Sequence, residues 1–75
     1  MRAEDIHSFL AVQPFALFRV CLSDGSSFDV RHPEMVILTR WYLDVGQPGA
    51  LPHLAETAQR YSLLHIVKVE TLQPA

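Results

Sequence analysis

Residues 15–31 read FALFRVCLSDGSSFDVR, and this stretch decides the fold. Every second residue is apolar on both sides of a short polar segment that contains one glycine. The alternating residues are Phe18, Val20 and Leu22 before that segment, and Phe28 and Val30 after it. Alternation of this period around a glycine-containing turn predicts a β-hairpin with one apolar face.

The loop length of the hairpin follows from the requirement that its apolar residues share one face. A two-residue loop would place Val20 opposite Asp29, so the apolar rows of the two strands would lie on opposite faces. A three-residue loop at 23–25 places Val20 opposite Phe28, and Arg19 opposite Asp29. Such loops combine a type I turn with a left-handed residue, and the glycine that ends this loop adopts that conformation without steric cost. The sequence therefore predicts the three-residue loop.

The length of the chain limits its stability. A single domain of 75 residues buries only about 60% of its unfolded surface. Domains of this size usually gain stability from disulfides, bound metals or oligomerisation. Cys21 is the only cysteine, which excludes an intramolecular disulfide, and its place within a strand predicts a small buried apolar side chain. The sequence has no metal-ligand spacing, so we expect by elimination a homo-oligomer.

The charge and hydropathy of the chain restrict its partners and its compartment. Six Lys and Arg residues against eight Asp and Glu give a net charge of −2, which is not typical of a strongly basic nucleic-acid-binding protein. No apolar run has the character of a signal peptide or the length that spans a membrane. We therefore expect a cytoplasmic protein without a membrane partner.

Residues 2–12, RAEDIHSFLAV, predict a short helix before the hairpin. Ile6, Phe9 and Leu10 lie on one apolar stripe at helical spacing. Pro14 disfavours helical geometry at the residue before it and ends the helix. We expect the stripe to cover an open end of the sheet; the alternative is a binding face for a partner.

The rest of the chain predicts two more strands, an insertion and a last strand. Residues 35–39 form an apolar run that Pro33 separates from the hairpin. Residues 41–45 alternate, with Trp41 on the same side as the aliphatic residues of that segment. Residues 52–60 are compatible with one or two helical turns. The predicted plan is a helix at 2–12, a four-stranded meander at 15–45, an insertion loop at 46–60, a final strand at 61–72 and a tail at 73–75.

This order of elements predicts the fold class. Sequential short strands with tight links are typical of an antiparallel sheet bent into a small barrel. We therefore expect one domain that is mainly β with one N-terminal helix. Its strands are expected to form a small five-stranded antiparallel barrel of the SH3-like or Sm-like type.

The chain resembles a group of small uncharacterised bacterial proteins along nearly its whole length. The pattern that carries the resemblance consists of QPF, FR, LSDG, FDV, HP and LLHI. In this sequence these segments are residues 13–15, 18–19, 22–25, 28–30, 32–33 and 63–66. The resemblance implies no function.

The chain is also similar to the Sm-like family, which includes the Sm, Lsm and bacterial Hfq proteins. The similarity lies in residues 20–25, VCLSDG, in residues 32–39, HPEMVILT, and in residues 61–69, YSLLHIVKV. It implies a homo-oligomeric ring, in which the fourth strand of one subunit pairs with the fifth strand of the next, and binding of single-stranded RNA. At the family's RNA-contacting positions this chain has Glu34-Met35 in place of Gln-Phe, and Leu63-Leu64 in place of Lys-His.

Nothing in the sequence predicts catalysis or a cofactor. The four histidines, His7, His32, His53 and His65, lie in four separate predicted elements. None belongs to an HxH, HExxH or CxxC spacing, and there is no glycine-rich phosphate loop. A nucleophile at Cys21 would be hard to reach in the middle of a strand. We therefore expect a protein that is not an enzyme and has no cofactor or metal.

Binding of RNA is one of two functions that the residues leave open. Arg40-Trp41-Tyr42 places a cation beside two aromatic rings at a turn, which is the chemistry of a stacking platform for bases. The candidate RNA-contacting residues are Arg31, His32, Arg40, Trp41 and His65. The alternative interpretation is that Trp41 belongs to the core or to a subunit interface, and that Arg40 is solvated.

Self-assembly is the other function, and it is our main expectation. The apolar residues of the third and fourth strands exceed what one small barrel can bury, and such apolar surface usually marks an interface. The candidate interface residues are Met35, Ile37, Trp41, Tyr42, Val67 and Val69. We expect a non-catalytic, ring-like homo-oligomer that serves as a binding or scaffold module.

Overall fold

A computed structural model describes residues 1–72, so the predicted tail at 73–75 lies outside the described residues. The elements are α1 (Ala3–Leu10), β1 (Phe18–Leu22), β2 (Ser27–Val30), η1 (Pro33–Met35), β3 (Val36–Leu38), β4 (Tyr42–Pro48), β5 (Ala55–Ser62), η2 (Leu63–His65) and β6 (Ile66–Thr71). Here η denotes a short 3₁₀ turn. The expected mainly β fold with one N-terminal helix is confirmed.

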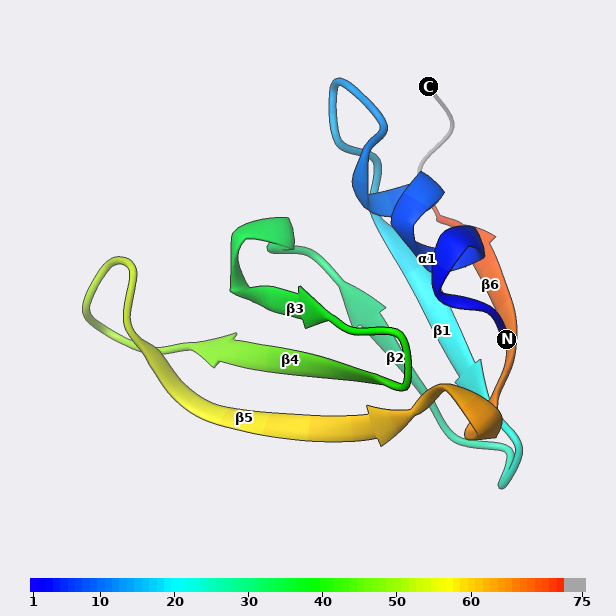
Figure 1. Ribbon diagram of the computed structural model, residues 1–75. Coiled ribbons are helices and arrows are strands. Elements are labelled where there is room, and N and C mark those ends of the chain that lie inside the picture. Colours follow the sequence, from blue (N-terminus) through cyan, green and yellow to red (C-terminus); the bar gives the residue numbers. More distant parts are fainter. Residues whose placement is uncertain (73–75) are drawn as a thin grey trace.

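The strands form two antiparallel three-stranded sheets (Figure 1). Sheet A has the order β2-β1-β6, and sheet B has the order β3-β4-β5. Within residues 1–72 there are six strands and no closed barrel, so the expected five-stranded barrel is not confirmed. The predicted four-stranded meander is also interrupted, because β2 and β3 do not pair. Pro33 begins η1 between them and cannot donate a hydrogen bond to a strand ladder.

The hairpin of β1 and β2 has the predicted register. Val20 lies opposite Phe28, and Arg19 lies opposite Asp29. The Leu22 N–H donates to the Ser26 carbonyl at 2.8 Å and closes the three-residue loop. Gly25 has a φ of +90°, which is the left-handed conformation that the loop requires. The prediction for this stretch is confirmed.

The prediction for residues 46–60 is wrong. These residues are not an insertion loop with helical turns, because β4 continues to Pro48 and β5 begins at Ala55. The two strands pair along their length and form a hairpin whose far end projects away from the rest of the molecule (Figure 1). Every residue from Gln47 to Arg60 is exposed, so this segment has no apolar periodicity by which a strand could be recognised.

Two other predicted strands differ from the structure at their ends. Met35 belongs to η1, so the third strand is shorter than expected and covers only Val36–Leu38. The predicted final strand at 61–72 is divided by η2 into the end of β5 and the separate strand β6. The Ser62 hydroxyl begins this turn by accepting a hydrogen bond from the Leu64 N–H at 3.3 Å.

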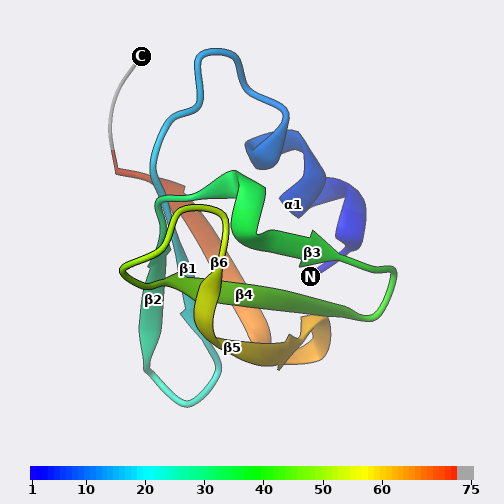
Figure 2. The same cartoon turned by 90° about the vertical axis from the view of Figure 1, so that its left-hand side faces the viewer.

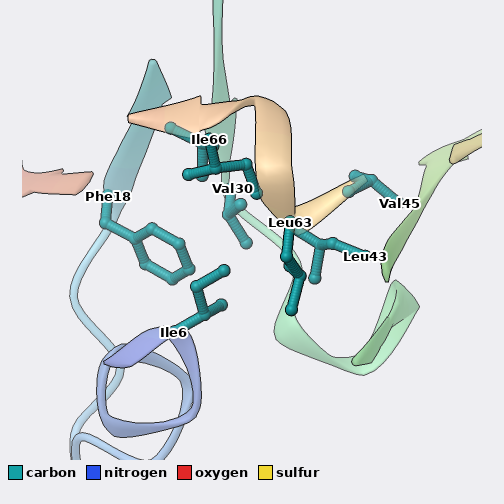
Figure 3. Packing of buried hydrophobic residues seen from close by; sticks show 8 residues of the cluster. Ile6, Phe18, Val30, Leu43, Val45, Leu63 and Ile66 are labelled. Carbon is teal, nitrogen blue, oxygen red and sulfur yellow. The ribbon is translucent and has the colours of Figure 1, made fainter. Parts of the chain in front are cut away.

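The core lies between the two sheets and is closed by α1. Its eight buried residues are Ile6, Phe18, Val20, Val30, Leu43, Val45, Leu63 and Ile66, and Figure 3 shows their packing. Ile6 is the contribution of the helix and points toward Phe18 (Figure 3). The neighbouring residues of the stripe, Phe9 and Leu10, are partly buried against the same core. The stripe therefore covers the core, with α1 beside β3 (Figure 2). The ring of Phe9 also lies 5.3 Å from that of Phe18 in β1.

Candidate functional site

The five candidate RNA-contacting residues do not form one surface. Arg31 and His32 follow β2 and border a hollow beside the end of β4. Arg40 and Trp41 lie in the turn at the opposite end of β4. His65 lies in η2, and its ring faces the tip of the β1–β2 hairpin. The structure therefore separates the residues that a shared RNA site would need together.

The turn between β3 and β4 presents Trp41 to solvent. Trp41 is 73% exposed, whereas Leu43 is buried, so the two residues do not share one side as the alternation of residues 41–45 predicted. The cause is Thr39, whose hydroxyl accepts hydrogen bonds from the N–H groups of Trp41 and Tyr42 and holds the chain in a turn. The strand consequently begins one residue later than predicted. The nearby Leu64 is 88% exposed, so two large apolar side chains project at this end.

The outer face of sheet B contains three of the candidate interface residues. Ile37 lies opposite Asp44, which in turn lies opposite Arg60. Ile37 is 63% exposed, and Met35 borders the same shallow hollow. Tyr42 shares this face, because the guanidinium carbon of Arg60 lies 3.7 Å from the centre of its ring. This face therefore combines exposed apolar side chains with one aromatic-stacked ion pair, and Glu34 and His53 border the same hollow.

Asp44 and Arg60 form an ion pair on the outer face of sheet B. Two hydrogen bonds of 2.8 and 3.0 Å join the guanidinium to the carboxylate. The hydrogen bond from Arg60 lowers the pKa of Asp44, and the same contact raises the pKa of Arg60. Both groups therefore stay charged around neutral pH, and the pair fixes the register of β5 on β4.

The two candidate interface residues of β6 differ in their surroundings. Val69 is partly buried and packs against the core. Val67 is 60% exposed and lies where the pairing of β1 with β6 shifts by one residue. Of these two valines, Val67 is therefore the one whose side chain is largely accessible to another molecule.

The outer face of sheet A is polar, and it includes Cys21. Cys21 pairs with Ser27 and Lys68 and is half-buried, so the expectation of a buried apolar cysteine is wrong. The alternation of β1 explains this position, since its buried residues are the even-numbered ones. On the same face the hydrogen bond from Arg19, 2.8 Å long, lowers the pKa of Asp29.

A cleft opens between the tip of the β1–β2 hairpin and the end of β5, and we call it the hairpin cleft. Its volume is about 620 Å³. The polar residues along it include Ser23, Ser26, Ser27, Gln59, Tyr61 and His65. The rings of Phe28 and Tyr61 stack within it with centres 4.3 Å apart and planes at 19°. Sequence reasoning missed this site because it depends on strand β5, which was not predicted.

Two hydrogen bonds join the hairpin tip to η2 at one end of the hairpin cleft. The Ser23 N–H donates to the His65 carbonyl at 2.8 Å, and the Ser23 hydroxyl lies 3.5 Å from Nδ1 of His65. Ser23, His65 and Asp24 do not form a catalytic triad. Oδ1 of Asp24 instead accepts hydrogen bonds from the N–H and the hydroxyl of Ser26 at 2.9 and 2.6 Å. These two contacts lower the pKa of Asp24. The hydrogen bonds of Ser23 and Asp24 therefore stabilise the turn between β1 and β2.

Within residues 1–72, no group of three or more His, Cys, Asp or Glu side chains is arranged to hold a metal ion. No helix of this part of the chain is long and apolar enough to cross a membrane. No protein-family model, no curated protein and no solved structure matches the sequence or the fold.

Proposed function

We propose that the chain is a non-catalytic module that assembles into a ring-like homo-oligomer through its strand edges. The observation that carries this proposal is the exposure of β5 as a long edge strand. This strand is eight residues long and lies at one edge of sheet B, and within residues 1–72 it pairs with β4 alone. Its first six residues are exposed on both faces. An edge strand of that length and exposure is normally covered by a helix, a loop or another chain.

The second edge that assembly would use is β6. This strand is the outer member of sheet A, and in the described part of the chain it pairs only with β1. Val67, exposed on β6, is the kind of apolar group that a neighbouring strand would cover. Joining β5 of one copy to β6 of the next is a head-to-tail contact, and such contacts generate closed rings when the rotation between copies closes.

The order of pairing supports an Sm-like arrangement of this assembly. The path β2–η1–β3 leads from sheet A to sheet B, and the path β5–η2–β6 leads back. If β2 and β3 are counted as one strand broken at Pro33, the pairing order is that of a five-stranded SH3-like barrel. On that count β5 and β6 correspond to the fourth and fifth strands, which the Sm-like resemblance assigns to the contact between subunits.

Light scattering with a parallel ultraviolet spectrum tests the proposal. At micromolar concentration we expect a mass that is a multiple of 8.5 kDa. A protein-type ratio of absorbance at 260 and 280 nm supports assembly alone, and a ring carrying nucleic acid would favour the RNA-binding alternative. A sharp monomer mass would overturn the proposal.

The variant Val67→Lys tests the contribution of β6. We expect it to shift the mass toward the monomer, because a lysine on an edge strand opposes pairing with another strand. The matched control is Val12→Lys, which introduces the same side chain at an exposed valine outside both sheets. Equal masses for the two variants would exclude β6 from the contact. Circular dichroism verifies that both variants remain folded.

A further inference from the structure

We propose that the hairpin cleft binds an uncharged, hydroxyl-rich ring ligand of the size of a monosaccharide. The proposal is independent of assembly, because it concerns side chains between the two sheets rather than the backbone edges. Its volume of about 620 Å³ is within the range of small-molecule sites in proteins. It lies at an open end between the sheets, where barrel-like folds commonly hold ligands.

Hydrogen-bonding side chains border the hairpin cleft on both of its sides. Ser23, Ser26 and Ser27 border the cleft on the hairpin side. The Ser26 hydroxyl donates to Asp24 at 2.6 Å and can accept a further hydrogen bond. Gln59 and Tyr61 border it from β5, and the Tyr61 hydroxyl donates to Oε1 of Gln59 at 2.6 Å. That bond orients the Gln59 amide and leaves its NH₂ group to donate elsewhere. A ligand with several hydroxyl groups can therefore find both donors and acceptors.

The hairpin cleft also contains an aromatic surface. Phe28 and Tyr61 stack nearly in parallel, and both rings line the cleft. Because each ring uses its neighbour to hold its orientation, the pair is a fixed apolar surface within a polar rim. Both rings come from the inner faces of their strands, as the core contacts of Phe28 and Tyr61 indicate. A ring-shaped ligand can place its apolar face there while its hydroxyls reach the rim.

The charge of the residues around the cleft distinguishes an uncharged ligand from an anionic one. Among the described residues that border the cleft, Asp24 is the one carboxylate, and none is a lysine or an arginine. Sites for phosphate, and grooves for single-stranded nucleic acid, combine their stacking or hydrogen-bonding groups with cations. The cleft therefore disfavours phosphorylated and carboxylated ligands and fits an uncharged one.

Titration followed by ¹⁵N–¹H correlation spectra of the full chain tests the proposal. The probes are D-glucose and N-acetyl-D-glucosamine, with inorganic phosphate and uridine as comparison ligands. We expect at least one sugar to shift the amide signals of Ser27, Gln59 and Tyr61, with saturation in the millimolar range, about 4 kcal/mol of binding free energy. We expect no saturable shift with phosphate. Absence of saturation with both sugars, or tighter binding of uridine or phosphate, would overturn the proposal.

Variants of β5 distinguish a specific site from general surface contact. Gln59→Ala removes the oriented amide, and we expect it to weaken sugar binding about fivefold, as the loss of one hydrogen bond does. Thr57→Ala is the matched control, because Thr57 lies two residues earlier on the same face of β5 and does not border the cleft. We expect its binding to equal that of the unsubstituted protein. Equal losses in both variants would refute the assignment to this cleft.

Discussion

Replacement of Gly25 tests the central hairpin at a single backbone position. Its φ of +90° lies in the region that residues with a Cβ atom rarely adopt. No heavy atom lies within 4 Å of the position that a Cβ would occupy. A substitution there therefore creates no clash, and its cost comes from the backbone conformation alone.

The expected cost can be ranked by side chain. A left-handed conformation costs an ordinary L-residue about 1–2 kcal/mol, so we expect Gly25→Ala to lower the free energy of unfolding by that amount. Gly25→Val is expected to cost more, because branching at Cβ makes positive φ still less favourable. Gly25→Asn is expected to cost least, since asparagine adopts this conformation most readily among residues with a side chain.

Urea denaturation followed by circular dichroism measures these differences. We expect the midpoint to fall in the order Asn, Ala, Val with an unchanged slope, because the native surface is the same. In a domain of this size each kcal/mol also lowers Tm by about 4–8 °C. Gly46→Ala is an informative comparison, because its Cβ would lie 3.0 Å from Cβ of Ala55 and the cost would be steric. Stabilities of all three Gly25 variants within about 0.5 kcal/mol of the unsubstituted protein would refute the left-handed turn.

Two further predictions concern the core and the ion pair of Arg19 with Asp29. Ile6→Ala should lower the free energy of unfolding by about 2–5 kcal/mol, because this fully buried residue joins the helix to the core, and urea denaturation measures it. The free energy of unfolding should also decrease as the pH is lowered, because Arg19 lowers the pKa of Asp29 in the folded state. The stabilisation from this pair is present above the unfolded pKa of about 4 and is lost as the pH falls through the lowered folded pKa. Denaturation midpoints measured below about pH 5 should fall less steeply in Asp29→Asn, and parallel curves would contradict this.

The hairpin and the helix could be predicted because burial in them leaves a pattern in the sequence. In β1 every second residue is buried or packs on the core, so a period of two is visible and only one register satisfies it. In α1, Ile6 is buried and its neighbours on the stripe are partly buried, which gives the helical spacing. The same alternation also predicts that Cys21 faces outward, because it lies between two residues that face the core.

Strand β5 could not be predicted because its first six residues are buried on neither face. The segment AETAQR has residues of good helix propensity and no apolar alternation. Pairing with β4 decides its conformation, together with the ion pair between Arg60 and Asp44. Local propensity is a weak preference, and tertiary contacts override it in such segments. The hairpin cleft, which needs Gln59 and Tyr61 on this strand, was hidden for the same reason.

The arrangement of strands also determines what a cut in the backbone would do. Residues 55–71 contribute one outer strand to each sheet, β5 to sheet B and β6 to sheet A. The remaining strands of both sheets come from the preceding part of the chain. A break in the exposed connection at 49–54 would therefore leave two fragments interleaved through both sheets and through a common core. Residues 55–71 thus connect sheet A to sheet B, so the two sheets cannot separate as independent lobes.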